Sequence, residues 1–126
     1  MERGKRILLV EDMDIIRDVL SGFLESEGYQ IEEARDGMEA IEKLNEKPFD
    51  VVITDIKMPR MDGISLLKEV RQFHPGTDVI VITAYNNRSP QTTLRLGAKA
   101  FIHKSCEVEA FINKIIDAIE KEGEEI

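Results

Sequence analysis

The sequence predicts a single α/β domain in which one parallel sheet of five strands is covered on both faces by five helices, in three α/β/α layers. First, short apolar runs alternate along the chain with segments whose apolar residues recur at helical spacing. Second, the connections between these segments are short, which favours parallel pairing through right-handed crossovers. Third, the 126 residues suffice to bury one core, and no linker or internal repeat divides them.

The first strand and helix are expected within residues 6–28. Residues 6–10 (RILLV) form a continuous apolar run, as in a strand buried on both faces. The helix that follows is expected to take Asp14 as its N-cap and to stop at Gly28. Its apolar positions at helical spacing are Ile15, Ile16, Val19, Leu20, Phe23 and Leu24.

Two further strands enclose the second helix. Residues 29–34 (YQIEEA) predict a weak strand, and RDG after them predicts a turn. The helix ends before Pro48, because the residue preceding a proline disfavours helical geometry; its apolar positions are Met38, Ala40, Ile41 and Leu44. The β-branched run at 51–56 (VVITDI) predicts the third strand.

The second half repeats this alternation. Ile64, Leu66, Leu67 and Val70 indicate the third helix. Strands are expected at 79–83 (VIVIT) and 100–104 (AFIHK), with a short helix between them that takes Ser89 as N-cap, Pro90 as first residue and Gly97 as its end. The last helix frays into the acidic residues 121–126, and its apolar positions are Val108, Phe111, Ile112, Ile115, Ile116 and Ile119.

Charge and composition exclude several functional classes. The chain has 17 Lys and Arg against 25 Asp and Glu, a net charge of −8, which repels nucleic-acid phosphates and anionic membrane surfaces. No apolar run approaches the roughly 20 residues that span a bilayer. Cys106 is alone, so an internal disulfide is impossible. We therefore expect a cytoplasmic protein without direct nucleic-acid or membrane partners.

Polar side chains stand where four of the expected strands end. The first strand is followed by Glu11 and Asp12, and the later ones end at Asp55, Thr83 and Lys104. Ligands of parallel α/β sheets bind outside the carboxyl ends of the strands, so these five residues mark the expected site. If the first and third strands are neighbours, three carboxylates crowd together, and such hard oxygen ligands suit Mg²⁺, or Mn²⁺ in its place.

This constellation suits phosphoryl transfer to a carboxylate. Asp55 would attack phosphorus as a nucleophile, while a metal and the Lys104 ammonium neutralise charge on the transferring group. The Thr83 hydroxyl would bind a phosphoryl oxygen, and the backbone carbonyl of Lys57 would add a metal ligand to Glu11, Asp12 and Asp55.

Each residue also has a simpler interpretation. Asp55 alone is typical of a turn, and the two acidic residues before the first helix favour its positive end. Thr83 alone would be an ordinary strand residue, Lys104 a solvated surface charge and Phe101 a core residue. Only their convergence on one edge of the sheet favours a site.

Four fragments at these strand ends, LLVED, ITDIKMPRMDG, VIVITAY and LGAKAFIHK, resemble the receiver domain of two-component response regulators. The resemblance covers essentially the whole chain. It implies a flavodoxin-like fold with strand order 2-1-3-4-5 and Mg²⁺-dependent phosphorylation of Asp55 by a phosphohistidine on a sensor histidine kinase or a histidine phosphotransfer protein. It further implies that Thr83 and Phe101 act as switch residues, rearranging the face made by the fourth helix, fifth strand and fifth helix for a downstream partner.

In two places the sequence suggests behaviour particular to this chain. Receiver domains usually carry proline after the residue matching Lys104, whereas Ser105 follows here, and a cis peptide bond before a non-proline residue costs about 3 kcal/mol. We therefore expect a slower or less tightly coupled switch. Lys57 and Tyr85 flank the path that the resemblance assigns to a hydrolytic water, and we expect both to shield the acyl phosphate.

Alternative functions remain at this stage. A stand-alone receiver, a monomer or a weak dimer when phosphorylated, is the main expectation; it transfers one phosphoryl group to itself and turns over no external substrate. The amino-terminal receiver of a larger transcriptional regulator is the alternative. A haloacid-dehalogenase-type phosphatase would need a second Asp where Lys57 stands, and a flavin or nucleotide binder would need a glycine-rich phosphate loop where EDMDII stands.

Overall fold

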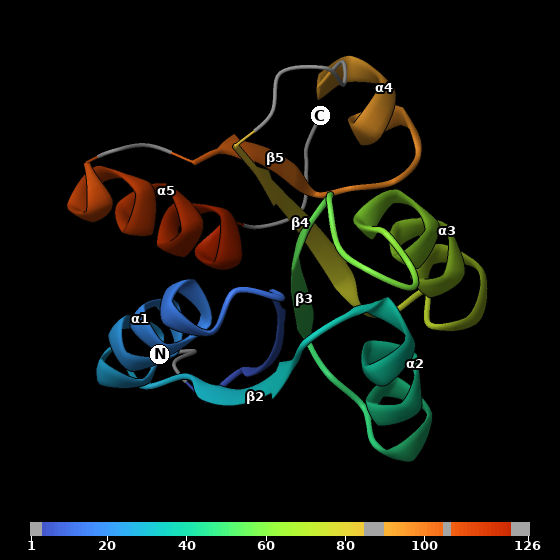
Figure 1. Ribbon diagram of the computed structural model, residues 1–126, viewed down its shortest axis with the longest axis horizontal. Coiled ribbons are helices and arrows are strands. Elements are labelled where there is room, and N and C mark those ends of the chain that lie inside the picture. The colour runs from blue at the N-terminus through green and yellow to red at the C-terminus, as the bar shows by residue number, and fades with distance from the viewer. Residues whose placement is uncertain (1–3, 85–89, 105–106, 122–126) are drawn as a thin grey trace.

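The computed structural model describes residues 4–84, 90–104 and 107–121. Five parallel strands form one sheet in the order β2-β1-β3-β4-β5 (Figure 1). The strands are β1 (Arg6–Val10), β2 (Gln30–Ala34), β3 (Val51–Asp55), β4 (Asp78–Thr83) and β5 (Ala100–His103). The helices are α1 (Asp14–Ser26), α2 (Gly37–Glu46), α3 (Gly63–Phe73), α4 (Pro90–Arg95) and α5 (Val108–Glu120). The predicted fold class and strand order are confirmed.

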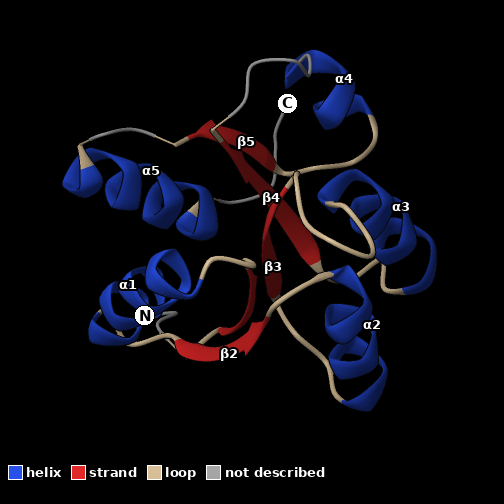
Figure 2. Ribbon diagram, viewed as in Figure 1, coloured by secondary structure: helices blue, strands red, loops and turns tan. Residues whose placement is uncertain are grey.

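Helices cover both faces of the sheet. In Figures 1 and 2, α1 and α5 lie on one side, and α2, α3 and α4 lie on the other. The inner strands β1, β3 and β4 are mostly apolar because both of their faces are buried, whereas the edge strand β2 is largely polar and partly exposed. Alternate residues therefore enter different cores: Ile7 and Leu9 of β1 point toward α1 and α5, whereas Leu8 and Val10 point toward α2 and α3.

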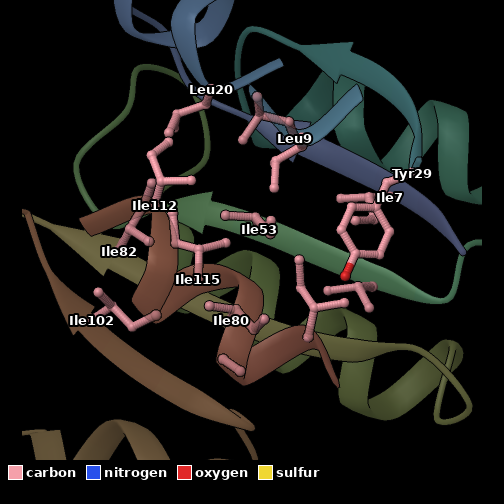
Figure 3. Packing of buried hydrophobic residues seen from close by; sticks show 14 of the residues in the cluster. Ile7, Leu9, Leu20, Tyr29, Ile53, Ile80, Ile82, Ile102, Ile112 and Ile115 are labelled. Atoms are coloured by element: carbon pink, nitrogen blue, oxygen red, sulfur yellow. The ribbon is translucent and has the colours of Figure 1, made fainter. Parts of the chain in front are cut away.

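The core beneath α1 and α5 is built mainly of aliphatic side chains. Figure 3 shows isoleucines of the central strands, such as Ile53 and Ile80, facing Ile112 and Ile115 of α5. Both α5 residues are almost completely buried. Burial of a side chain of this size contributes about 1.5–3 kcal/mol to the stability of the fold. This layer therefore holds the sheet, and with it the strand ends, in place.

The start of α1 differs from the prediction. Asp14 is the first helical residue rather than the N-cap; Met13 occupies the N-cap and makes no side-chain capping bond. The Asp14 carboxylate accepts a hydrogen bond from Arg17 at 2.5 Å. The expected stops at Gly28 and Gly97 are confirmed, with φ angles of 99° and 109° that favour glycine. The expected cap at Ser89 lies outside the described residues.

Only half of the apolar stripe on α1 packs into the core. Leu20 and Leu24 are buried, but Ile15 is 77% exposed, and Val19 and Phe23 are also exposed. The stripe is wider than the contact with the sheet, and Ile15 and Val19 line a groove of about 200 Å³ between α1 and α5. None of the helices within the described residues combines the length and hydrophobicity needed to cross a bilayer.

The connection after β3 folds back tightly on the strand. The Gly63 N–H donates to the Ile56 carbonyl at 2.8 Å, and a Cβ atom at Gly63 would lie 2.1 Å from the Asp55 carbonyl oxygen. The atoms that such a Cβ would meet belong to the backbone of Asp55 and Ile56, which cannot move aside as a flexible side chain could. Glycine at this position therefore allows the start of α3 to lie against the residue that ends β3.

We expect Gly63→Ala to lower the free energy of unfolding by about 3 kcal/mol, because the new methyl group meets backbone. Gly22→Ala is the control: Gly22 is exposed within α1 and has open space around it, so this change should add about 0.5–1 kcal/mol. Urea denaturation measures both. Equal effects of the two substitutions would refute the close approach at Gly63.

Candidate metal centre

The carboxyl ends of the strands bring the predicted residues together. Glu11 and Asp12 follow β1, Asp55 ends the neighbouring β3, and Lys104 follows β5. One carboxylate oxygen from each of the three acidic residues lies within 4.8 Å of the other two. The predicted crowding of carboxylates from two adjacent strands is therefore present.

Lys104 connects the two buried carboxylates. Its Nζ donates to Asp55 Oδ2 at 2.8 Å and to Glu11 Oε1 at 3.0 Å. The Lys104 backbone N–H donates to the Thr83 carbonyl at 2.7 Å, which fixes the residue just beyond the end of β5. Its side chain is only 15% exposed, so the solvated surface charge considered above is the wrong interpretation.

The environment of Glu11 disfavours a negative charge unless a cation is near. The residue is fully buried, and burial raises the pKa of its carboxyl above the usual value, although the charge and hydrogen bond of Lys104 act in the opposite direction. The negative charge of Asp55 raises it further. Two carboxylates therefore share one ammonium, and additional positive charge would stabilise both.

The same pair keeps Lys104 charged. Burial by itself lowers the pKa of the Lys104 ammonium, but hydrogen bonds and charges from Asp55 and Glu11 outweigh burial, so its pKa lies above the usual value. An ammonium is therefore held directly beside the Asp55 carboxylate at neutral pH. This is the arrangement expected of a group that neutralises charge on a transferring anion.

One carboxylate oxygen of Asp55 is available to bind a cation. Its Oδ1 is buried and has no hydrogen-bond partner among the described residues, while Oδ2 accepts from Lys104. A buried carboxylate oxygen without a partner is costly, and a bound cation would satisfy it. Asp12 is exposed, so the cluster opens to solvent on that side. A buried orphan oxygen within a set of three carboxylates fits a hard divalent ion such as Mg²⁺.

The predicted switch residues lie on one face of the sheet. Thr83 is fully buried at the end of β4, and Phe101 pairs with Val81, two residues before Thr83. Phe101 is partly buried and packs against the core beneath α2 and α3. Because residues two apart in a strand share a face, Thr83 and Phe101 point to the same side of the sheet.

The remaining predicted residues lie along the loops. The Lys57 side chain is exposed, two residues beyond Asp55. Tyr85 and Ser105 lie outside the described residues, so the expectations for them stay predictions.

Two arginines beside the site were missed by the sequence analysis. Arg17 donates to the Glu11 carbonyl oxygen at 2.7 Å. Arg60, whose φ is 68°, donates to both oxygens of Asp36 at 2.8 and 3.0 Å, and so ties the β3–α3 loop to the N-terminus of α2. Asp36 caps α2 through the Glu39 N–H, and the sequence signal was an Asp followed three residues later by Glu. Arg17 also pairs locally with Asp14, but no local pattern marks the contacts with Glu33 and Asp36, because these partners lie 16 and 24 residues away from Arg17 and Arg60.

Comparison with known proteins gives a consistent result. A family model described as response regulator receiver domain matches residues 7–116. The chain is 34% identical over 120 residues to the chemotaxis protein CheY of Thermotoga maritima, covering 94% of this chain and 97% of that protein. It is 38% identical over 104 residues to the transcriptional regulatory protein ZraR of Klebsiella oxytoca, covering 81% of this chain but 24% of that protein.

Solved structures share the fold. A CheY-like receiver domain protein from Methanospirillum hungatei superposes with a TM-score of 0.83 at 33% identity, over 93% of this chain and 94% of that one. The response regulator TrrA from Thermotoga maritima, solved in complex with Mg(2+)-BeF, gives a TM-score of 0.80 at 32% identity, over 90% of this chain and 98% of that one.

We expect Lys104→Met to lower the free energy of unfolding without metal by about 3 kcal/mol, because it leaves Glu11 and Asp55 without their shared cation. Mg²⁺ should then stabilise this variant more than the wild type, since the ion meets two uncompensated carboxylates. Urea denaturation with and without saturating Mg²⁺ measures both effects.

The control is Lys99→Met. Lys99 is 16% exposed and pairs with Asp78 at 3.6 Å, away from the carboxylate cluster. Its removal should leave the response to Mg²⁺ as in the wild type. If Mg²⁺ stabilised the Lys104→Met and Lys99→Met proteins by equal amounts, the sharing of the two carboxylates between ammonium and metal would be wrong.

Proposed function

The chain belongs to the response regulator receiver family, and on this premise we propose that Asp55 is its phosphoryl acceptor in a two-component relay. The observation that carries the proposal is the buried Oδ1 of Asp55, which has no hydrogen-bond partner among the described residues, on a carboxylate whose other oxygen accepts from Lys104. This carboxylate lies in a set of oxygens suited to a divalent ion and beside a fixed ammonium.

Glu11, Asp12 and Asp55 would hold Mg²⁺, with the Lys57 carbonyl as a further ligand, and Mn²⁺ suits the same oxygen set. When bound, the ion neutralises charge on the transferring phosphoryl group. The hard oxygen ligands would favour such an ion, and the exposed side at Asp12 would leave room for water beside it.

The reaction is a displacement at phosphorus. An oxygen of Asp55 attacks the phosphorus of a phosphohistidine, the new O–P bond forms as the P–N bond breaks, and the imidazole leaves with the electron pair and takes up a proton. Lys104 pairs with Asp55 Oδ2 in the structure. After the transfer, its ammonium would pair with the negatively charged phosphoryl oxygens. Thr83 would then donate its hydroxyl to one of them.

The consequence is a switch rather than turnover of an external substrate. Movement of Thr83 toward the phosphoryl group would free space on the face that it shares with Phe101, and so alter α4, β5 and α5 for a downstream protein. The proposed donor is a sensor histidine kinase or a histidine phosphotransfer protein. The lone Cys106 suits a reducing cytoplasm as the compartment of this exchange.

Two settings for such a switch have support in the relatives. The match over 97% of CheY favours a stand-alone receiver. The match to 24% of ZraR favours the receiver of a larger transcriptional regulator. In either setting the chemistry at Asp55 is the same.

Incubation with Mg²⁺ and a small acyl phosphate tests the acceptor. We expect the wild type to gain one phosphoryl group, stable in acid and labile in base, and Asp55→Asn to gain none; intact-protein mass spectrometry measures both. Asp62→Asn is the matched control, because Asp62 caps α3 through the Ser65 N–H and Asn caps equally well. A gain in the Asp55→Asn protein equal to that of the wild type would refute the assignment.

The same preparation measures the shielding expected of Lys57 and Tyr85. After removal of the donor, the acyl phosphate should decay faster in Lys57→Ala and Tyr85→Ala than in the wild type. Unchanged decay in both variants would contradict the shielding role without affecting the acceptor.

A further inference from the structure

Arg17 is a buried arginine that the proposed reaction does not use. It lies one turn into α1, and the residue is 8% exposed. Its guanidinium donates to three acceptors: Nη1 to the Glu11 carbonyl at 2.7 Å, Nε to Glu33 Oε1 at 3.2 Å, and Nη2 to Asp14 Oδ1 at 2.5 Å. The three acceptors come from the end of β1, from edge strand β2 and from the first turn of α1.

The cost of burying this charge points to a specific role. An apolar side chain would serve the packing between a helix and an edge strand without any need for pairing. Burial by itself lowers the pKa of the Arg17 guanidinium, but hydrogen bonds with Asp14 and Glu33 outweigh burial and leave it charged. The planar guanidinium of an arginine presents several N–H donors in fixed directions, so it can join three acceptors.

The group that Arg17 holds is the backbone of a candidate metal ligand. On its amino side, the Glu11 N–H donates to the Ala34 carbonyl at 3.0 Å. On its carboxyl side, the Glu11 carbonyl is joined through Arg17 to Glu33, whose second oxygen accepts from Ser21 Oγ at 2.6 Å. Both peptide groups of Glu11 are therefore tied to the end of β2.

We infer that Arg17, held by Glu33, is a positioning residue for the metal centre: it fixes the Glu11 backbone so that the carboxylates of Glu11 and Asp12 meet that of Asp55. This inference rests on the proposed function. Partners behind the ligands of a metal site typically change its affinity 10- to 100-fold when they are mutated.

For Arg17→Met, a positioning role and simple electrostatics predict changes of opposite sign in the affinity for Mg²⁺. Removal of a positive charge near three carboxylates would, by charge alone, tighten Mg²⁺ binding. Loss of a positioning contact would weaken it. The double variant Arg17→Met/Glu33→Gln separates the two further, because it removes one positive and one negative charge and leaves the net charge unchanged.

Mg²⁺ titration of the full chain, followed by isothermal calorimetry well below the melting temperature, provides the test. We expect the Kd for Mg²⁺ to rise about tenfold or more in Arg17→Met and in the double variant, and severalfold in Glu33→Gln. The control is Glu32→Gln. Glu32 is the residue before Glu33 in β2, points to the other face of the sheet and pairs with Lys47 at 2.5 Å. The Kd of the Glu32→Gln protein for Mg²⁺ should therefore differ less than twofold from that of the wild type.

Amide hydrogen exchange supplies a readout that needs no metal. The Glu11 N–H and the Met13 N–H, which donates to Glu11 Oε2 at 3.2 Å, should exchange faster in Arg17→Met and Glu33→Gln than in Glu32→Gln. A merely structural role would change the melting temperature and leave both the Kd and the pattern of exchange around Glu11 as in the control.

The outcomes are distinct. A wild type that binds no Mg²⁺ would overturn the proposed metal centre. A wild type that binds Mg²⁺ with Arg17→Met and Glu33→Gln showing an unchanged or lower Kd would overturn the positioning role alone. If Arg17→Met failed to fold, Glu33→Gln, which keeps the shape and one acceptor oxygen, would decide between the two results.

Discussion

Repulsion among carboxylates at the ends of two neighbouring strands is the constraint on which the rest of the site depends. Glu11 is completely buried and Asp55 almost so, and the two share the Lys104 ammonium at 3.0 and 2.8 Å. One cation cannot satisfy all of this charge, and Asp55 Oδ1 is left without a partner among the described residues. A second, divalent cation would relieve the repulsion between these carboxylates, and its charge would allow an anion to bind beside it.

The topology of the sheet makes this crowding possible. Because β1 and β3 are neighbours in the order β2-β1-β3-β4-β5, their carboxyl ends deliver acidic residues to one point, while β5 delivers the ammonium from farther along the same edge. The end of the edge strand β2 and the turn after it support both loops. Glu33 reaches the β1–α1 loop through Arg17, and Asp36 reaches the β3–α3 loop through Arg60. A strand that contributes no ligand thereby acts on the geometry of the site.

The sequence predicted the elements well because fully buried strands leave continuous apolar runs and amphipathic helices leave apolar residues at helical spacing. The convergence of Asp55, Glu11 and Lys104 followed from the general rule for strand ends in parallel sheets. The cap of α1 was predicted wrongly, since Asp is common both as an N-cap and in the first turn of a helix; here Asp14 lies in the first turn, where it pairs with Arg17. Exposure of Ile15 and Phe23 depends on how α1 sits on the sheet, and the roles of Arg17 and Arg60 depend on partners 16 and 24 residues away, which no local pattern reveals.

The most direct measurement of the central claim is a crystal structure of the chain soaked with Mn²⁺, whose anomalous scattering locates the ion. We predict one ion about 2.1 Å from an oxygen of Asp55 and from a carboxylate oxygen of Asp12 or Glu11, in the octahedral geometry of a hard divalent cation. Lys104 should remain within hydrogen-bonding distance of the Asp55 carboxylate. A saturating soak that leaves no anomalous peak between these carboxylates, or places it elsewhere on the molecule, would contradict the account.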